Sequence, residues 1–187
     1  MARVTILSTK RTITDAGEIA RTLAPVGITY ENWGVGRLPA NLRDRNLSDA
    51  EKQQVLDAYK PEIDQLKAKG GYVTADVISL YPDTPNIDTV CAKFDKKHIH
   101  TEDEVRFVVQ GKGVFRVFPE DSAALDVELH PGDYISVPAK YRHLFFLGKE
   151  KQITCIRLFV DTAGWVAHYV EEGKAQFDLM TGAQTPA

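Results

Sequence analysis

The chain has 187 residues, of which 43% are hydrophobic and 26% are charged, so it can bury a core and is not a disordered tail. Its 23 basic and 26 acidic residues leave a net charge of −3, which gives no sign of a nucleic-acid or membrane-surface partner. Two cysteines are too few for a disulfide scaffold, and no apolar run suits a signal peptide or a membrane span. We therefore expect a cytoplasmic protein.

Residues 1–70 carry mainly helical signals, apart from a short alternating run at residues 1–8 that predicts a strand. Thr14 and Asp15 are helix-capping residue types, and a short helix is expected to follow them and to end before Pro25. The chain is thus expected to begin with a largely helical segment.

A second helical region follows Ser48. Glu51 lies three residues after Ser48, which is the spacing of a capping box, and apolar side chains then recur at helical spacing over residues 55–66. Pro61 interrupts this run, because its ring removes a backbone donor and disfavours helical geometry at the preceding residue. The pattern predicts a kinked helix or two consecutive helices, closed by Gly70 and Gly71.

Short alternating strands and turns dominate the chain after residue 70. One short helix is expected within this part, over residues 87–94, with Asn86 as its cap. The predicted strands are residues 72–81, 105–109, 114–118, 134–137, 143–147 and 152–160. Antiparallel strands of this length and spacing predict a small barrel or a double-sheet jelly roll, so that the fold is mainly β with accessory helices.

The strongest chemical signal is the segment that begins with His98 and His100. Side chains two residues apart on a strand share a face, so both imidazoles can point the same way. If residues 101–103 form a turn, Glu104 opens the next strand beside them, and two imidazoles with one carboxylate are ligands for a divalent transition metal. Glu102 is the alternative carboxylate if the turn differs. Two histidines in this spacing would otherwise suit an exposed strand end.

A fourth ligand has two candidates in the β-rich part of the chain. His143 lies at the start of a predicted strand, whereas His130 precedes Pro131 in a predicted turn. The residue pattern alone leaves both open. His168 has no identifiable partner, and a solvated turn residue is the simpler interpretation of His130.

These residues resemble the two cupin motifs. The first motif is matched by His98, His100, Glu104 and Gly111, and the second by Gly132, Pro138 and His143. Six residues separate Glu104 from Gly111, as in the motif. The chain departs from the usual motif residues, two glycines and an asparagine, at Ala92, Lys140 and Leu147. The resemblance therefore rests on the candidate ligands more than on the glycines.

A closer resemblance is to the acireductone dioxygenase family of methionine salvage. It spans roughly residues 1–172 and is most specific over residues 72–170. The segments that carry it are YPDTPN at 81–86, KF at 93–94, the two histidines followed by EDEVRF at 102–107, IRLF at 156–159 and GWVA at 164–167.

The resemblance implies a cupin-type β-barrel with one Fe(II) or Ni(II) per chain. The implied ligands are His98, His100, Glu104 and His143. The implied substrates are O2 and the acireductone 1,2-dihydroxy-3-keto-5-methylthiopentene. With iron the family forms 4-methylthio-2-oxobutanoate and formate, and with nickel it forms methylthiopropionate, formate and carbon monoxide.

Two arginines and three aromatic residues are candidates for contact with the substrate. Arg106 lies two residues after Glu104, so it shares that strand face and can hydrogen-bond an anionic oxygen; a surface salt bridge is the alternative. Arg157 lies in an apolar strand, where it needs an acidic partner or an anionic ligand, and structural pairing is the simpler of the two. The aromatic candidates for a pocket around the methylthio tail are Phe94, Phe145 and Trp165. Plain core packing is the alternative for each of them.

Two other functions stay open at this point: a metal-binding cupin of different chemistry, such as another dioxygenase or an isomerase, and a non-enzymatic cupin that binds a ligand. We expect one cupin-type domain over residues 1–182, with a helical part at 1–70, a barrel core at 71–172 and a disordered tail at 183–187. A monomer is expected, because no sustained apolar helix face is left without a partner.

Overall fold

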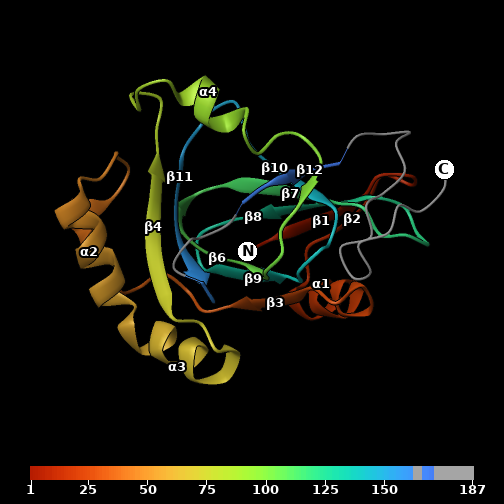
Figure 1. Cartoon of the computed structure of the whole chain (residues 1–187), viewed down its shortest axis with the longest axis horizontal. Coiled ribbons are helices and arrows are strands. Elements are labelled where there is room, and N and C mark those ends of the chain that lie inside the picture. The colour runs from red at the N-terminus through yellow and green to blue at the C-terminus, as the bar shows by residue number, and fades with distance from the viewer. Residues whose placement is uncertain (162–165, 171–187) are drawn as a thin grey trace.

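Two antiparallel β-sheets face each other and enclose the main core of the protein (Figure 1). The computed structural model describes residues 1–161 and 166–170. The first sheet has seven strands in the order β12-β5-β10-β7-β8-β1-β2, and the second has five in the order β3-β9-β6-β11-β4. Together with the short helices, this arrangement confirms the prediction of a mainly β fold with accessory helices.

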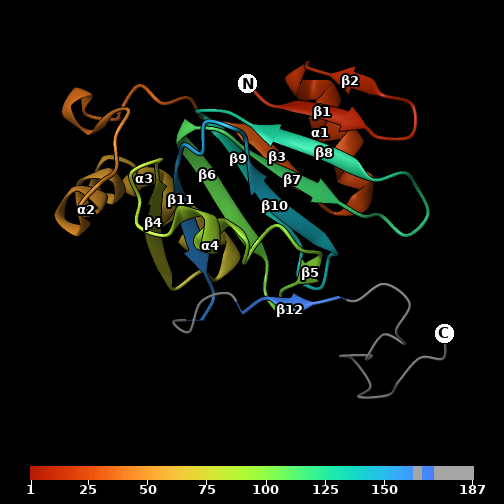
Figure 2. The ribbon, with the colours of Figure 1, turned by 90° about the horizontal axis from the view of Figure 1, so that it is seen from above.

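In Figure 2 the first sheet lies toward the viewer, with β12 and β5 near the bottom and β1 and β2 at the upper right. They are β12 (His168–Tyr169), β5 (His98–Ile99), β10 (His143–Leu147), β7 (Gly113–Val117), β8 (Leu125–Leu129), β1 (Arg3–Ile6) and β2 (Arg11–Ile13). The strands of the second sheet are β3 (Thr29–Asn32), β9 (Asp133–Val137), β6 (Glu104–Gly111), β11 (Ile153–Phe159) and β4 (Thr74–Leu80).

Helices occupy the N-terminal part of the chain and the connection after β4. They are α1 (Ala16–Leu23), the 3-10 turns η1 (Ala24–Val26) and η2 (Ala40–Leu42), α2 (Asp49–Ala58), α3 (Lys60–Gly70) and α4 (Ile87–Cys91). The backbone N–H of Glu18 donates to the Asp15 carboxylate over 2.8 Å, so α1 begins at the predicted cap.

The predicted capping box and helix break after Ser48 are both confirmed. Ser48 and Glu51 bond each other's backbone at the start of α2. Pro61 lies in the first turn of α3, where its missing N–H leaves no helical bond unmade, so the chain forms two consecutive helices. Gly71 then ends α3 in the left-handed conformation with φ 70°.

The helix predicted over residues 87–94 is shorter than expected and is not capped by Asn86. Asn86 has φ 55°, in the left-handed region, and its side chain makes no capping hydrogen bond. A capping side chain needs an extended backbone to reach the first free N–H groups. The helix α4 ends at Cys91, three residues before the predicted end at residue 94.

The N-terminal part of the chain contributes strands to both sheets. β1 pairs with β2 and with β8 in the first sheet, and β3 pairs with β9 in the second. β2 and β3 lie where the sequence predicts mainly helix. Both are short, at three and four residues, so they show little alternation for a pattern to reveal.

Two hydrophobic cores lie on opposite faces of the second sheet. The first core lies between the sheets and includes Val108, Phe115, Val127, Ile135 and Cys155. The second lies on the outer face, where α2 and α3 pack beside β4 (Figure 1), and includes Val55, Ile63, Phe107, Ile156 and Leu158. Alternate residues of β6 and β11 therefore enter different cores, which follows from the two-residue period of a strand. No helix among residues 1–161 and 166–170 is long and apolar enough to cross a membrane.

Candidate metal centre

Three histidines and a glutamate meet at one end of the barrel, which we call the site end. His98 lies on β5 directly opposite His143, the first residue of β10, while Glu104 opens β6 of the facing sheet and His100 follows β5. All four side chains are buried, and one ligand atom from each lies within 4.8 Å of the others. The structure thus brings His143, and not His130, to the predicted cluster.

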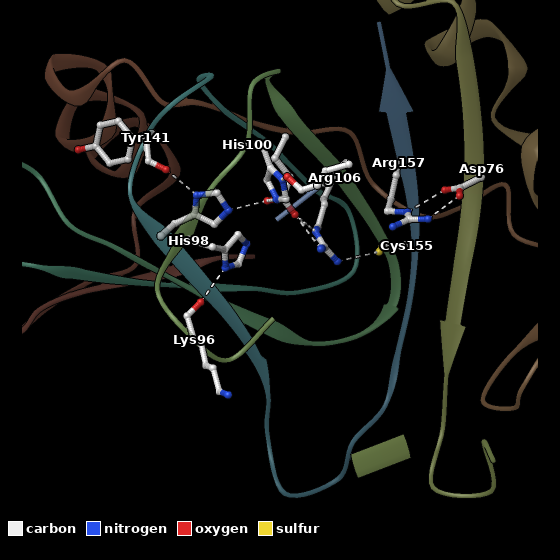
Figure 3. A network of polar contacts seen from close by, with 11 residues as sticks. Asp76, Lys96, His98, His100, Arg106, Tyr141, Cys155 and Arg157 are labelled. Carbon is white, nitrogen blue, oxygen red and sulfur yellow. Dashed lines mark hydrogen bonds and ion pairs between the residues drawn. The ribbon is translucent and has the colours of Figure 1, made fainter. Parts of the chain in front are cut away.

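Backbone carbonyls hold all three imidazoles. The Nδ1 atoms of His98, His100 and His143 lie 2.7, 2.9 and 2.8 Å from the carbonyl oxygens of Lys96, Val166 and Tyr141, respectively (Figure 3). A carbonyl oxygen can only accept, so each Nδ1 carries the proton and each Nε2 presents its lone pair. Burial lowers the pKa of His98 to about 4, which keeps its imidazole neutral near pH 7. Neutral imidazoles with a fixed Nδ1 proton are the form that binds metal ions.

The carboxylate of Glu104 points one oxygen at the histidines. Its Oε2 lies 2.7 Å from Nε2 of His143 and 3.3 Å from Nε2 of His100. Because the proton of each imidazole is on Nδ1, the Nε2 lone pairs face the lone pairs of the Glu104 oxygen. A cation between them would accept all of these lone pairs. The donor set therefore fits a divalent transition-metal ion.

The other oxygen of Glu104 is held by Arg106. Its Oε1 lies 2.7 Å from both Nε and Nη2 of Arg106, and both side chains are only 2% exposed. Burial alone would raise the pKa of Glu104, but the charge of Arg106 holds the pKa of this carboxyl well below its usual value. Arg106 shares the face of Glu104 as predicted, and its contact is with this carboxylate.

Arg106 is enclosed by core side chains. Its guanidinium carbon lies 4.1 Å from the centre of the Phe145 ring, and Nη1 lies 3.8 Å from the Cys155 thiol. The backbone N–H of Phe145 donates to the carbonyl of Phe94 over 2.8 Å, and both side chains belong to the core between the sheets. Trp165, the third predicted pocket aromatic, lies outside the described residues.

Arg157 forms the structural pair that its place in an apolar strand predicts. Its Nε and Nη2 donate to the two oxygens of Asp76 at 2.8 and 2.5 Å (Figure 3). The partner lies 81 positions away on the neighbouring strand β4. Nothing in the local sequence identifies Asp76 as this partner, so the pair is missed without the strand register.

The remaining candidates lie elsewhere. His130 is at the opposite end of the barrel, where its Nε2 lies 2.8 Å from Glu128. Glu102 does not belong to the cluster formed within the described residues. Its neighbour Asp103 accepts a hydrogen bond from the backbone of Ala139 over 2.9 Å, which ties the turn after His100 to the loop before His143.

The backbone conformation of Lys140 shows how the chain accommodates one departure from the cupin motif. It occupies a position where the motif usually has glycine, and its φ of 64° lies in the left-handed region that glycine adopts without strain. Its backbone N–H donates to the carbonyl of His100 over 2.7 Å. The backbone at this position thus keeps the glycine-like conformation with a different side chain.

A double-sheet barrel with three histidines and a glutamate gathered at one end defines the class of metal-binding cupins. Comparison with known proteins narrows this class. The chain matches the model of the ARD/ARD' family over residues 24–167. It is 44% identical to the acireductone dioxygenase of Exiguobacterium sibiricum over 173 residues, which is 92% of this chain and 97% of that protein.

Two further relatives agree. The acireductone dioxygenase of Bacillus pumilus is 41% identical, over 92% of this chain and 99% of that protein. The solved structure of acireductone dioxygenase from Bacillus anthracis, with a cadmium ion in its active center, matches with a TM-score of 0.86 at 41% identity, over 90% of this chain and 98% of that one. The chain belongs to the acireductone dioxygenase (ARD/ARD') family.

Proposed function

We propose that this protein is a metal-dependent dioxygenase of methionine salvage that cleaves 1,2-dihydroxy-3-keto-5-methylthiopentene with O2. The observation that carries the proposal is the convergence of four buried ligand atoms within 4.8 Å, in a chain of this family. With iron the expected products are 4-methylthio-2-oxobutanoate and formate. With nickel they are methylthiopropionate, formate and carbon monoxide.

The cofactor in this proposal is one Fe(II) or Ni(II) per chain, held by His98, His100, Glu104 and His143. Imidazole nitrogens suit both metals, and the donor set does not distinguish them. When bound, the ion would act as a Lewis acid that holds the electron-rich enediolate for reaction with oxygen. The three imidazoles add no charge, so an anionic substrate meets only one carboxylate among the ligands.

Arg106 is proposed to have two roles at this site. Its charge keeps Glu104 ionised, as the lowered pKa of that carboxylate indicates. It also places a buried positive charge next to the ligands, where a substrate oxyanion gains more from it than it would in water. Replacement of Arg106 by alanine should reduce turnover more than metal content. Equal losses of both would indicate a purely structural role.

Arg157 and the aromatic residues complete the proposed substrate site. Arg157 lies directly opposite Arg106 on the neighbouring strand, and its guanidinium, paired with Asp76, is proposed to border the substrate site. Phe145 packs on Arg106, and Phe94 is joined to Phe145 through the backbone. Together with Trp165, these rings are proposed to line the pocket for the apolar methylthio tail.

The decisive experiment is to prepare the acireductone without oxygen, add O2 to iron-loaded and nickel-loaded protein, and analyse the products. The proposal expects rapid loss of substrate with both metals and carbon monoxide only with nickel. The His143→Ala variant, which lacks one ligand, serves as the inactive control. Metal-loaded protein that leaves the substrate to decay at the rate of that control would overturn the proposal in favour of a cupin of different chemistry.

Within this proposal the protein acts as a monomer in the cytoplasm. Cys91 and Cys155 are both free thiols, as a reducing compartment would keep them. Among the described residues, the exposed large hydrophobic side chains are Met1, Val73, Val160, Val166 and Tyr169. Size-exclusion chromatography with light scattering tests the monomer, for which a mass near 20.9 kDa is expected.

A further inference from the structure

A row of charged side chains crosses the second sheet at the site end. Asp76 on β4, Arg157 on β11 and Arg106 on β6 lie directly opposite one another in the strand register. Opposed residues on neighbouring strands share a face, and this is the inner face, since Cys155 lies two residues before Arg157 and belongs to the core between the sheets. Two arginines directly opposite each other repel. Each therefore needs a carboxylate of its own.

The two arginines obtain their carboxylates in different settings. Arg106 is locked against Glu104, and both side chains are 2% exposed. Arg157 is held by Asp76 in a two-point contact, but here the side chains are 19% and 45% exposed. A partly exposed arginine can be reached by an anion from solution, so the fork of Arg157 would be open to such an anion if Asp76 lost its charge. The planar fork of arginine suits the two oxygens of a carboxylate or phosphate in the same way.

From this geometry we infer that Asp76 is a specificity-determining residue. Its carboxylate fills the fork of Arg157 and thereby excludes phosphates and carboxylates that would otherwise bind one strand away from Arg106. The inference rests on the proposed function, because it concerns which ligands may enter that site. A substrate whose charge lies only on its enediolate loses nothing by this arrangement. A ligand with a second anionic group must first displace Asp76.

Asp76 competes well with free anions for the guanidinium of Arg157 because it belongs to the same chain. A carboxylate on the neighbouring strand is present at a high effective concentration, whereas a free anion must come from dilute solution. Removing the charge of Asp76 while keeping its shape should therefore open the fork to small anions. The Asp76→Asn substitution does this, since an asparagine side chain has the same size and remains able to accept one hydrogen bond from Arg157.

The test uses nickel-loaded protein and inorganic phosphate, observed by the line broadening of its phosphorus NMR signal. Paramagnetic nickel broadens the signal of phosphate that binds near the metal. The Asp76→Asn variant should bind phosphate on the order of tenfold more tightly than the wild type, in keeping with a charge-assisted two-point contact. The double variant Asp76→Asn, Arg157→Gln should lose this gain.

A matched pair on the first sheet provides the control. Arg116 on β7 donates to both oxygens of Asp126 on β8 at 2.7 and 2.9 Å, but this pair lies on the outer face of the barrel. The Asp126→Asn variant should broaden the phosphate signal no more than the wild type. Equal broadening in both single variants, no gain with Asp76→Asn, or a gain that survives Arg157→Gln would each overturn the inference. The measurement needs no turnover, so failure of the proposed dioxygenase activity would leave it intact.

Discussion

Two histidine–glutamate pairs lie at opposite ends of the barrel, and their contacts are nearly the same. His143 and Glu104 are 2.7 Å apart at the site end, and His130 and Glu128 are 2.8 Å apart at the far end. The first pair is 2% exposed on both sides and faces the barrel interior. The second is 33% and 20% exposed, on the outer face, where Arg3 also pairs with Glu128.

The difference shows that the contact itself does not make a metal centre. At the site end the Nδ1 proton of each histidine is held by a carbonyl, so the Nε2 lone pairs converge with the carboxylate. At the far end one imidazole meets one carboxylate in partial contact with water, which is an ordinary surface ion pair. The pair at the site end differs from the pair at the far end in the convergence of its ligand atoms and in its burial. Both differences can be tested.

The largest contrast is expected for metal retention. The His143→Ala substitution removes one of four ligands and should lower metal affinity by more than roughly 100-fold, beyond the effect of losing a partner outside the ligand set. His130→Ala should keep the metal content of the wild type. Metal per chain after dialysis, measured by mass spectrometry, checks both variants. Comparable losses in the two would contradict the assignment of the fourth ligand.

A second contrast concerns stability without metal. Glu104→Gln leaves the buried charge of Arg106 without its counter-charge and should cost about 3–5 kcal/mol in the free energy of unfolding. Glu128→Gln should cost about 1 kcal/mol or less. Urea unfolding of the metal-free proteins at pH 7 compares them, and similar costs would remove the distinction between the two pairs.

The same experiment has a pH dependence of known sign. The pKa of Glu104 is lower in the folded protein than its usual value of 4.5, so ionised Glu104 stabilises the fold above that pH. As the pH falls below about 4.5, the unfolded chain takes up this proton first. The stability difference between wild type and Glu104→Gln should therefore shrink in that range.

A third prediction connects the far end to the site end. A Cβ atom added at Gly113 would overlap the ring of Phe145, which packs on Arg106. Gly113→Ala should cost about 1–3 kcal/mol in stability, as overpacking does, and should reduce turnover by moving Phe145. Gly36 has open space around it and provides the control. If Gly36→Ala and Gly113→Ala behave alike, the contact does not constrain Phe145.

The smallest effect is expected from His130 itself. His130→Gln should change the free energy of unfolding by less than about 1 kcal/mol, and this change should shrink further in high salt, because a partly exposed pair is screened. Urea unfolding at low and high salt measures it. A large, salt-independent loss would mean that the far-end pair is as structural as the one at the site end.

Local patterns predicted much of the fold because their causes are local. The cap at Asp15, the capping box at Ser48 and the break at Pro61 each depend on residues within a few positions, and all three hold. The strand predicted over residues 143–147 has the observed bounds of β10. The prediction that Asn86 caps a helix was wrong for a local reason too, because the backbone of Asn86 has the left-handed conformation.

Features that depend on strand register could not be predicted in this way. His130 and His143 were equivalent by residue type, and only the pairing of β10 with β5 places His143 opposite His98. The partner of Arg157 depends on the register between β4 and β11. Only the family resemblance pointed to His143 alone, because no single local pattern contains that register.

The carbonyls that hold the three imidazoles have a consequence for protein engineering. Their oxygens belong to the main chain of residues 96, 141 and 166, so side-chain substitutions at those positions leave the acceptors in place. A designer who copied only the four ligand side chains onto another barrel would obtain rings free to rotate and to exchange tautomers. The portable unit is three short stretches of backbone together with the ligands that they orient.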